Sequence, residues 1–283
     1  MKVLFLILNY KTYKETITLT KNLYNAGLKD KYVLIVDNSS PNESYFELTK
    51  ELSGLDNIEV IASDINGGYA KGNNYGLKYA KKYNPQYVCI INNDVIFDIN
   101  TIDRLCEWYE RIPSVAFIAP IQILPNGKEA IFRNMDVPTI WTDLSLYNPF
   151  SRKFHYYIEN TKIKGVNEIG IIPGAFIFTN YHLFESLGFF DESTFLFCEE
   201  RFIAKKAQIA GLKSYVILGE TYLHNHSTTI NNESSKRKQR EMIQEGRCLY
   251  HKKFSRYPFF CTSILKIAFY IKEFYLRRLK GDV

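Results

Sequence analysis

The sequence is informative first for what it lacks. Its five cysteines include no C-x-x-C pair and no disulfide-like spacing, which suits a reducing compartment and argues against a zinc site. No stretch reaches the roughly 20 apolar residues that a transmembrane helix needs. The apolar run at residues 3–8 is too short for a signal peptide, and Asn9, Tyr10 and Lys11 stand where small residues would mark a cleavage site. We therefore expect a buried first strand in a cytoplasmic protein.

A glycine-rich phosphate loop is also absent after this first strand. Neither G-x-G-x-x-G nor G-x-x-x-x-G-K-[ST] follows it, which disfavours a dinucleotide oxidoreductase and a P-loop enzyme. A sugar-nucleotide nucleotidyltransferase also uses an α/β sheet and a metal-binding aspartate, but it would usually carry a glycine-rich loop at this point. It remains the less favoured enzymatic alternative.

Strong charge of one sign is missing as well. The formal net charge is only +6, and much of the excess lies from Lys236 onward. A basic tail can meet nucleic acid, anionic lipid or solvent. Because the basic residues accompany no known recognition module, a nucleic-acid-binding protein is a disfavoured alternative and we expect no nucleic-acid partner.

What is present is an alternation of short apolar runs and amphipathic stretches, which predicts an α/β fold with a mostly parallel central sheet flanked by helices. Thr12 and Glu15 are spaced as a capping box for a first helix that ends near Gly27. Ser40 and Pro41 are expected to open the second helix. The predicted strands span residues 3–8, 32–36, 58–62, 87–91, 115–119, 174–178 and 214–218.

Two segments depart from this alternation. Residues 125–168 lose periodicity and collect Pro, Asn and aromatic residues, so we expect an excursion over the active site. Residues 231–283 read as a basic, aromatic helical extension of a 1–230 catalytic domain. Its apolar and charged positions fall on separate faces: Ile264, Ala268, Ile271 and Tyr275 against Lys266, Glu273, Arg277 and Lys280. Packing on the domain and lying on a membrane surface both remain open for this helix.

Polar clusters follow the predicted strands, and ligands of parallel α/β sheets bind at the carboxyl ends of strands. These clusters are Asn9-Tyr10, Asp37-Asn38-Ser39-Ser40, Asn66-Gly67-Gly68 and Asn92-Asn93-Asp94. The glycines after the third strand would let backbone approach a flat ligand such as a nucleobase. Asp94 could hold Mg²⁺ or Mn²⁺ together with a diphosphate, although an aspartate at this place can also simply cap a turn.

Two further groups carry candidate chemistry. Glu199 and Glu200 begin a helix after an aromatic run, where the helix dipole alone would favour acids, yet apolar surroundings would also raise the pKa of a general base. His224 and His226 point apart in an extended chain. A two-histidine chelate is therefore not expected, but one of them could bind a metal or a diphosphate.

Taken together and in order, these segments resemble the family 2 glycosyltransferases, in particular the bacterial rhamnosyltransferase-like branch. The resemblance covers about residues 1–230. Its motifs are VLFLILNY, VDNSS, NGGYAKGNNYGLKYA, INNDVIF, PGAFIF, LGFFDESTFLFCEERF and YLHNHS. Each motif alone is weak, but the order and spacing of the set are specific.

The resemblance implies a GT-A fold and assigns roles to residues by position. Asp94 would hold the metal, assisted by His224. Gly174 and Ala175 would line the sugar and acceptor pocket near Asp191. The donor nucleotide would be bound by Asn9, Asp37, Asn38, Asn66, Gly67, Gly68, Asn73 and Asn92.

The implied reaction is a metal-dependent, inverting glycosyl transfer from dTDP-rhamnose or a UDP-sugar to a glycan or lipid-linked acceptor in cell-surface polysaccharide synthesis. Glu200 is the expected general base and Glu199 the alternative, because the family usually has Glu-Asp here. Arg201 and Phe202 also depart from the small or acidic residues common at these positions. The metal would be Mn²⁺ or Mg²⁺, and the protein would be cytoplasmic or peripheral on the inner face of the membrane.

Overall fold

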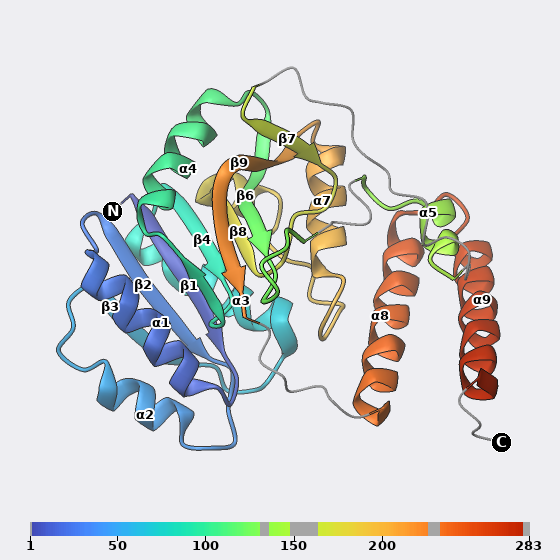
Figure 1. The fold of residues 1–283 in the computed structure, drawn as a ribbon, viewed down its shortest axis with the longest axis horizontal. Helices are drawn as coiled ribbons and strands as arrows, with labels where there is room; N and C mark the ends of the chain where they lie inside the picture. The colour runs from blue at the N-terminus through green and yellow to red at the C-terminus, as the bar shows by residue number, and fades with distance from the viewer. Residues whose placement is uncertain (1, 131–135, 148–163, 226–232, 280–283) are drawn as a thin grey trace.

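The structure is a computed structural model that describes residues 2–130, 136–147, 164–225 and 233–279. A mixed sheet with helices on both faces forms the larger part, and two long helices follow it at one side (Figure 1). The strands are β1 (Val3–Asn9), β2 (Lys31–Asp37), β3 (Ile58–Ala62), β4 (Tyr87–Ile91), β5 (Val95–Phe97), β6 (Val115–Ile123), β7 (Val166–Ile169), β8 (Phe176–Asn180) and β9 (Lys213–His224). The helices are α1 (Tyr13–Ala26), α2 (Ser44–Glu51), α3 (Gly68–Ala80), α4 (Asn100–Arg111), α5 (Ile140–Ser145), α6 (Tyr181–Ser186), α7 (Glu199–Ile209), α8 (Glu233–Phe254) and α9 (Pro258–Leu279), with a 3₁₀ turn at Lys81–Tyr83.

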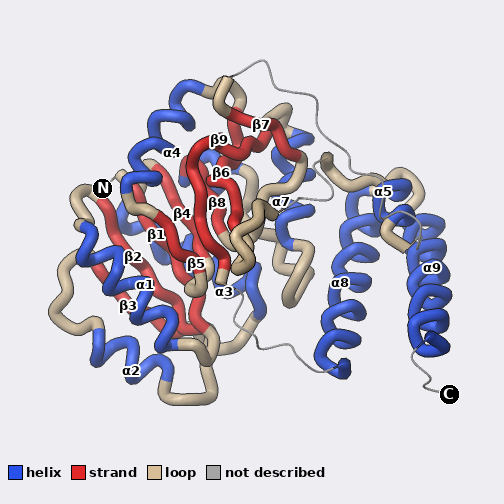
Figure 2. Tube along the Cα trace, viewed as in Figure 1, coloured by secondary structure: helices blue, strands red, loops and turns tan. Residues whose placement is uncertain are grey.

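The sheet has the strand order β3-β2-β1-β4-β8-β6-β9-β5, and β7 pairs with β9 (Figure 2). The first four strands in this order run parallel. β8 then runs antiparallel to β4 and β6, and β9 is antiparallel to both β5 and β7. The predicted fold class is confirmed, but this half of the sheet is more mixed than the expected mostly parallel arrangement.

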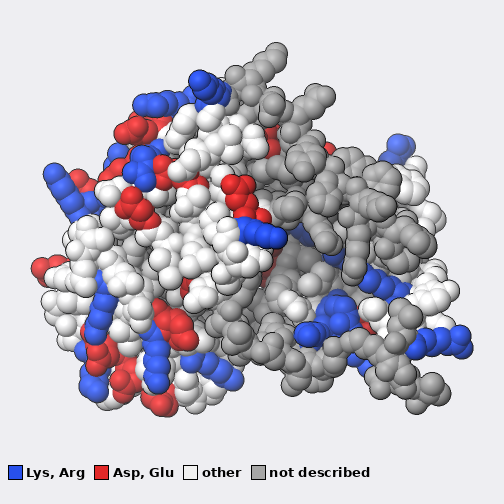
Figure 3. All heavy atoms as spheres, viewed as in Figure 1, with Lys and Arg blue, Asp and Glu red and all other residues white. Residues whose placement is uncertain are grey.

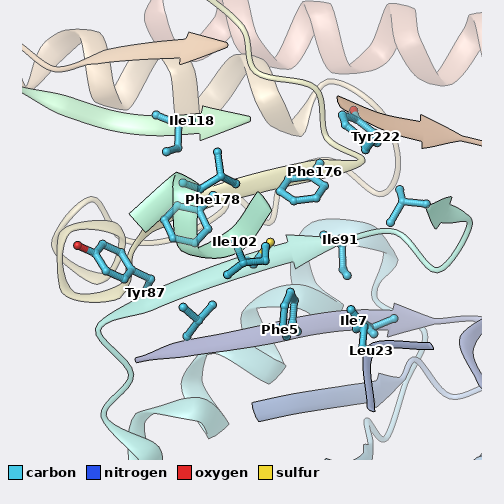
Figure 4. Close-up of a cluster of buried hydrophobic side chains, with 14 of the residues drawn as sticks. Phe5, Ile7, Leu23, Tyr87, Ile91, Ile102, Ile118, Phe176, Phe178 and Tyr222 are labelled. Atoms are coloured by element: carbon cyan, nitrogen blue, oxygen red, sulfur yellow. The ribbon is translucent and has the colours of Figure 1, made fainter. Parts of the chain in front are cut away.

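The first strand shows why its sequence is apolar without interruption. Alternate residues of a strand point to opposite faces. Phe5 therefore lies in the core under α1, α2 and α4, shown in Figure 4, whereas Leu4 and Leu6 lie in the core under α3, α6 and α7. All three are fully buried, as is typical of a strand covered by helices on both faces. The polar residues that follow such strands are thereby held at one edge of the sheet.

Two predicted helix starts are wrong in detail. Thr12 precedes α1 but its side chain makes no capping bond, because the hydroxyl accepts a hydrogen bond of 2.7 Å from Asn93 Nδ2 instead. The second helix begins at Ser44, later than expected, since Ser40 is bound to the carboxylate of Asp37. In both cases a side chain assigned to a cap is used to tie together loops at the carboxyl edge.

The structure also contains elements that the sequence pattern did not predict. β5 and β7 are too short to show periodicity, and β9 is longer than the predicted 214–218 strand. Within the irregular segment 125–168, the described parts form α5 and β7, while 131–135 and 148–163 lie outside the described residues. The extension forms α8 and α9, and α9 is packed on α8 and α5.

Candidate functional site

The first polar cluster at the carboxyl edge is a buried network around Asp37. Asn9 donates 2.7 Å to Asp37 Oδ1 and accepts 2.8 Å from Thr16. The backbone N–H and hydroxyl of Ser40 donate to the same carboxylate at 2.9 and 2.8 Å. Asn9 and Asp37 are both buried. Asn9 therefore orients Asp37, and both side chains are engaged within the protein. Contact of either one with a nucleotide stays a prediction.

The loop before α3 is fastened to the same edge. Asn38 donates to Asn66 Oδ1 at 3.0 Å and to the carbonyl of Gly68 at 3.2 Å. Gly68 adopts φ +82, and a Cβ there would lie 2.0 Å from the carbonyl oxygen of Phe195. Tyr69 N donates 2.8 Å to that same oxygen. Gly68 thus lets the backbone at Phe195 approach closely, and its contact with a nucleotide stays a prediction.

The other glycines of this segment serve the packing of α3. A Cβ at Gly72 would lie 2.6 Å from Leu8, and one at Gly76 would lie 2.5 Å from Leu6, so both let the helix approach the sheet closely. At Gly67 a Cβ would meet only the side chain of Lys71. Asn73, in contrast, is buried with a donor bonded to Tyr69 O and with Oδ1 lacking a hydrogen-bond partner among the described residues.

Asp94 and His224 come together through β5, which the sequence did not reveal. Val95 pairs with His224 in the β5–β9 ladder, and Asn225 N donates 2.9 Å to the carbonyl of Asp94. Asp94 Oδ1 consequently lies 3.1 Å from His224 Nε2. This oxygen is buried and accepts no hydrogen bond from the described residues. His226 lies outside the part of the chain that the structure describes.

The donor atoms of these two side chains are suitable ligands for a divalent cation. A carboxylate oxygen without a hydrogen-bond partner and an imidazole nitrogen are suitable ligands for Mn²⁺. Mg²⁺ and related ions usually take one or two protein ligands and complete their shell with substrate phosphates and water. In the described ranges no three His, Cys, Asp or Glu side chains gather as a ready metal site. Asp94 and His224 would supply two ligands, and diphosphate oxygens and water would complete the shell.

Two hydrogen-bonded side chains, Gln122 and Tyr222, orient His224. His224 Nδ1 lies 3.2 Å from Gln122 Nε2, and Tyr222 donates 3.1 Å to Gln122 Oε1. Partners of this kind fix the ring orientation of a ligating histidine. Burial raises the pKa of Tyr222, and the charges of Asp94 and Glu200 raise it further. Tyr222 is thus connected to His224 through Gln122.

The two glutamates at the start of α7 occupy different environments. Glu199 is buried, and its Oε1 accepts a hydrogen bond of 3.3 Å from Thr194. Burial, and secondly the neighbouring charge of Glu200, raise the pKa of Glu199 to about 8. Burial also raises the pKa of Glu200, although this residue keeps some exposure to solvent. Glu199 can therefore hold a proton near neutral pH.

Glu200, rather than Glu199, contacts the predicted substrate residues. A Cβ at Gly174 would lie 2.1 Å from Glu200 Oε1, so the glycine leaves the space that the carboxylate occupies. Tyr69 donates 2.7 Å to the carbonyl of Gly174, and Asn92 N donates 3.0 Å to the carbonyl of Ala175. Gly174 and Ala175 thus contact three parts of the predicted site. These are the loop that contains Asn92, Tyr69 at the start of α3, and Glu200, the candidate base.

The backbone that presents these glutamates is strained. Phe197 and Cys198 have φ of 71 and 74, a conformation that costs roughly 1–2 kcal/mol per residue for L-amino acids. The Cys198 side chain is pressed against α8, where a Cβ at Gly246 would lie 2.8 Å from Cys198 Cβ. Helix α8 therefore packs directly against the strained turn, a contact that could not be predicted from the sequence of the helix.

A buried ion network fastens α7 to the extension. Asp143 in α5 is fully buried and accepts from Arg201 Nη1 at 2.8 Å, and its Oδ2 lies 2.8 Å from His251 Nε2. Burial alone would raise the pKa of Asp143, but the bonds to His251 and Arg201 outweigh it and lower the pKa to about 2. The unusual Arg201 is thus explained by Asp143, and Phe202 packs against Tyr250 of α8.

Asp191 is engaged in a comparable way. Its carboxylate accepts a hydrogen bond of 3.0 Å from Ser193 N and forms an ion pair with Lys253 of α8. The nearby Asn74 exchanges two hydrogen bonds of 3.0 Å with the backbone of Phe190. These contacts give Asp191 a structural use, and its contact with substrate stays a prediction.

This chain is similar in sequence to a known hexosyltransferase. A low-salt glycan biosynthesis hexosyltransferase, Agl10 of Haloferax volcanii, is 26% identical over 196 residues, which are 69% of this chain and 58% of that protein. The chain thus spans less than two thirds of this relative.

Solved structures share the fold at low identity. The mannosyltransferase PcManGT of Pyrobaculum calidifontis, in complex with GDP-Man and Mn²⁺, superposes with a TM-score of 0.61 at 13% identity, covering 95% of this chain and 69% of that one. TarS of S. aureus in complex with UDP-GlcNAc gives 0.59 at 15% identity, covering 99% and 75%. These similarities confirm the GT-A fold.

The sequence itself carries the family assignment. Residues 5–185, more than half of the chain, match Glycosyl transferase family 2. The matched range includes the Asp37 network, the loop before α3, and Asp94. The chain therefore belongs to glycosyl transferase family 2.

Proposed function

We propose that this protein transfers a sugar from a nucleotide-diphosphate donor to a glycan or lipid-linked acceptor with inversion at the anomeric carbon. The observation that carries the proposal is an arrangement at one edge of the sheet. Asp94 lies 3.1 Å from His224, and the Glu200 carboxylate lies beside Gly174, whose neighbour Ala175 is bonded to Asn92. Family membership favours this reaction over nucleotidyl transfer and over nucleic-acid binding.

The donor is expected to lie along the carboxyl edge. Asp37 and the Asn38–Asn66 loop would contact its nucleotide, and the diphosphate would reach Asp94. The relatives' nucleotides are UDP and GDP in the solved complexes, and dTDP-rhamnose follows from the sequence resemblance. A divalent ion, Mn²⁺ or Mg²⁺, held by Asp94 and His224 would neutralise charge on the departing diphosphate.

Glu200 is the proposed base. It removes the proton of the acceptor hydroxyl while that oxygen attacks the anomeric carbon from the side opposite the diphosphate. The bond to the new oxygen forms as the bond to the diphosphate oxygen breaks, so no covalent enzyme intermediate is needed. A positioned base of this kind contributes about 10²–10⁴-fold in rate, and Gly174 provides the space in which its carboxylate lies.

The test is turnover of a donor panel. The full chain is incubated with Mn²⁺ and UDP-GlcNAc, a UDP-hexose, GDP-Man or dTDP-rhamnose, with and without glycan and lipid-linked acceptors, and release of nucleoside diphosphate is measured. We expect one nucleotide class to be consumed, a product of inverted anomeric configuration, and loss of turnover in Glu200→Gln. A folded protein that consumes none of these donors, or a product that retains configuration, would contradict the proposal.

A further inference from the structure

Helix α9 is fixed in orientation by polar contacts on its inner side. Glu273 is buried and accepts 2.7 and 3.2 Å hydrogen bonds from Arg240 of α8. Lys272 donates 3.1 Å to the carbonyl of Leu146, just after α5. Cys261 and Leu265 are buried on the same side. One face of the helix is therefore buried against the rest of the protein, and the opposite face points to solvent.

That outer face is apolar, which reverses the pattern of an ordinary surface helix. Its large side chains are between 53% and 86% exposed: Phe259, Phe260, Ile267, Tyr270, Ile271 and Phe274. The apolar face predicted from the sequence overlaps this one only in part. Ile271 and Tyr275 are exposed, whereas Ile264 and Ala268 are half-buried. Glu273, expected on the opposite charged face, is buried. An exposed apolar face of this size marks an interaction surface.

The charges around this face have one sign. Glu273 is the only acidic residue between 256 and 279, and its charge is paired with Arg240 inside. Arg256, Lys266 and Arg278 are exposed around the apolar side chains. Figure 3 shows uncharged and basic residues over this part of the surface, at its right edge. Aromatic and aliphatic side chains rimmed by cations are the pattern that binds anionic lipid surfaces.

We propose that the outer face of α9 docks on an anionic bilayer, with the helix lying in the plane of the membrane surface. Among the described residues no helix is long and apolar enough to cross a membrane, so contact through this face would be in the interface. A second copy of the chain is a poorer occupant. A symmetric dimer brings the same patch against itself, which would bring Lys266 and Arg278 of one copy close to the same cations of the other. The surface is independent of the donor site, so it would bring the enzyme to acceptors carried by lipid.

The experiment is vesicle co-sedimentation of the full chain with phosphatidylcholine alone or mixed equally with phosphatidylglycerol. The variant combines Phe260→Ser, Ile267→Ser and Phe274→Ser. The matched control is Phe46→Ser in α2, which removes a phenylalanine that is also 63% exposed. Light scattering gives the oligomeric state of each protein, and binding of UDP, GDP and dTDP with Mn²⁺ reports the donor site separately.

We expect tight binding only to vesicles that contain phosphatidylglycerol, weakened about tenfold or more by the α9 substitutions and by high salt. The Phe46→Ser protein should bind as the wild type does, and nucleotide binding should not change in any variant. Wild-type protein that ignores the vesicles, binding that survives the α9 substitutions, or a dimer that these substitutions dissociate would each overturn the proposal. A protein that binds vesicles but no nucleotide would instead contradict the proposed reaction.

Discussion

The space beside Gly174 is filled by the carboxylate of Glu200, whose Oε1 would lie 2.1 Å from a Cβ at that glycine. The obstructing atom is the end of a side chain and not backbone, so it can move. Gly174→Ala should therefore fold with little loss of stability but displace the carboxylate. We expect kcat to fall about tenfold or more, because small misplacements of catalytic groups are costly. A melting temperature near wild type with unchanged turnover would show that Glu200 is not the base.

The raised pKa of Glu200 predicts a pH dependence. A base must be ionised, so the rate should rise with pH through the raised pKa of Glu200. Glu199→Gln should retain activity, because the base is still present. Glu200→Gln should lose about 10²–10⁴-fold at every pH. A pH–rate profile checks both, and the reverse pattern would make Glu199 the base.

The same pair affects stability in a defined direction. The folded state holds protons that the unfolded chain releases above its ordinary pKa of 4.5. Stability contributed by these glutamates should therefore decrease as the pH rises from about 4.5 to about 8. Urea unfolding of the wild type and of Glu199→Gln across this range measures the effect, and the variant should show a smaller decline. Equal declines would contradict the assigned shift.

The buried Asp143 predicts a large stability change. Asp143→Asn leaves Arg201 and Arg247 without their counter-charge, and breaking a buried pair typically costs about 3–5 kcal/mol. The control is Asp103→Asn, which removes an exposed carboxylate 2.9 Å from Lys31 and should change stability by less than about 1 kcal/mol. Chemical unfolding compares the two. Since the pKa of Asp143 is lowered to about 2, its contribution is complete above about 3.8 and is lost as pH falls toward 2. Similar losses in both variants would contradict the network's role.

Gly68 and Gly54 form a matched pair for the close approach of α3. Their φ values are +82 and +77, but a Cβ at Gly54 meets nothing within 4 Å, whereas one at Gly68 would meet Phe195 O. Gly54→Ala should cost about 1–2 kcal/mol from backbone strain alone. Gly68→Ala should cost about 1–3 kcal/mol more, because backbone must shift. Equal costs would show that the Phe195 contact is not tight in solution.

Much of the fold could be predicted because the physical signal was local. Strands such as β1 and β4 are continuous apolar runs ending in Asn or Asp, and a parallel sheet brings those ends to one edge. Gly27 ended α1 where expected, with φ +100. These regularities need no knowledge of partners elsewhere in the chain.

The parts that were missed depend on pairing between distant segments. Because β5 has only three residues, the sequence shows no periodicity there. The β5–β9 ladder, which sets Asp94 beside His224, could therefore not be predicted. Asp143 looks like any first-turn acid of a short helix until Arg201 and His251 are seen to surround it. The positive φ of Gly68 and the nearby Phe195 carbonyl, which leave room only for a glycine, are likewise visible only in the structure.

The central claim is that Asp94 and His224 bind a metal ion together with the donor diphosphate, and titration calorimetry tests it most directly. UDP, GDP and dTDP are titrated into the wild type, Asp94→Ala and His224→Ala, with and without Mn²⁺, and the matched control is Asp98→Ala on the exposed turn before α4. We predict Mn²⁺-dependent binding of one nucleotide class to the wild type and the control, and its loss in Asp94→Ala. Binding that is indifferent to Mn²⁺ or to the Asp94 substitution would contradict the assignment.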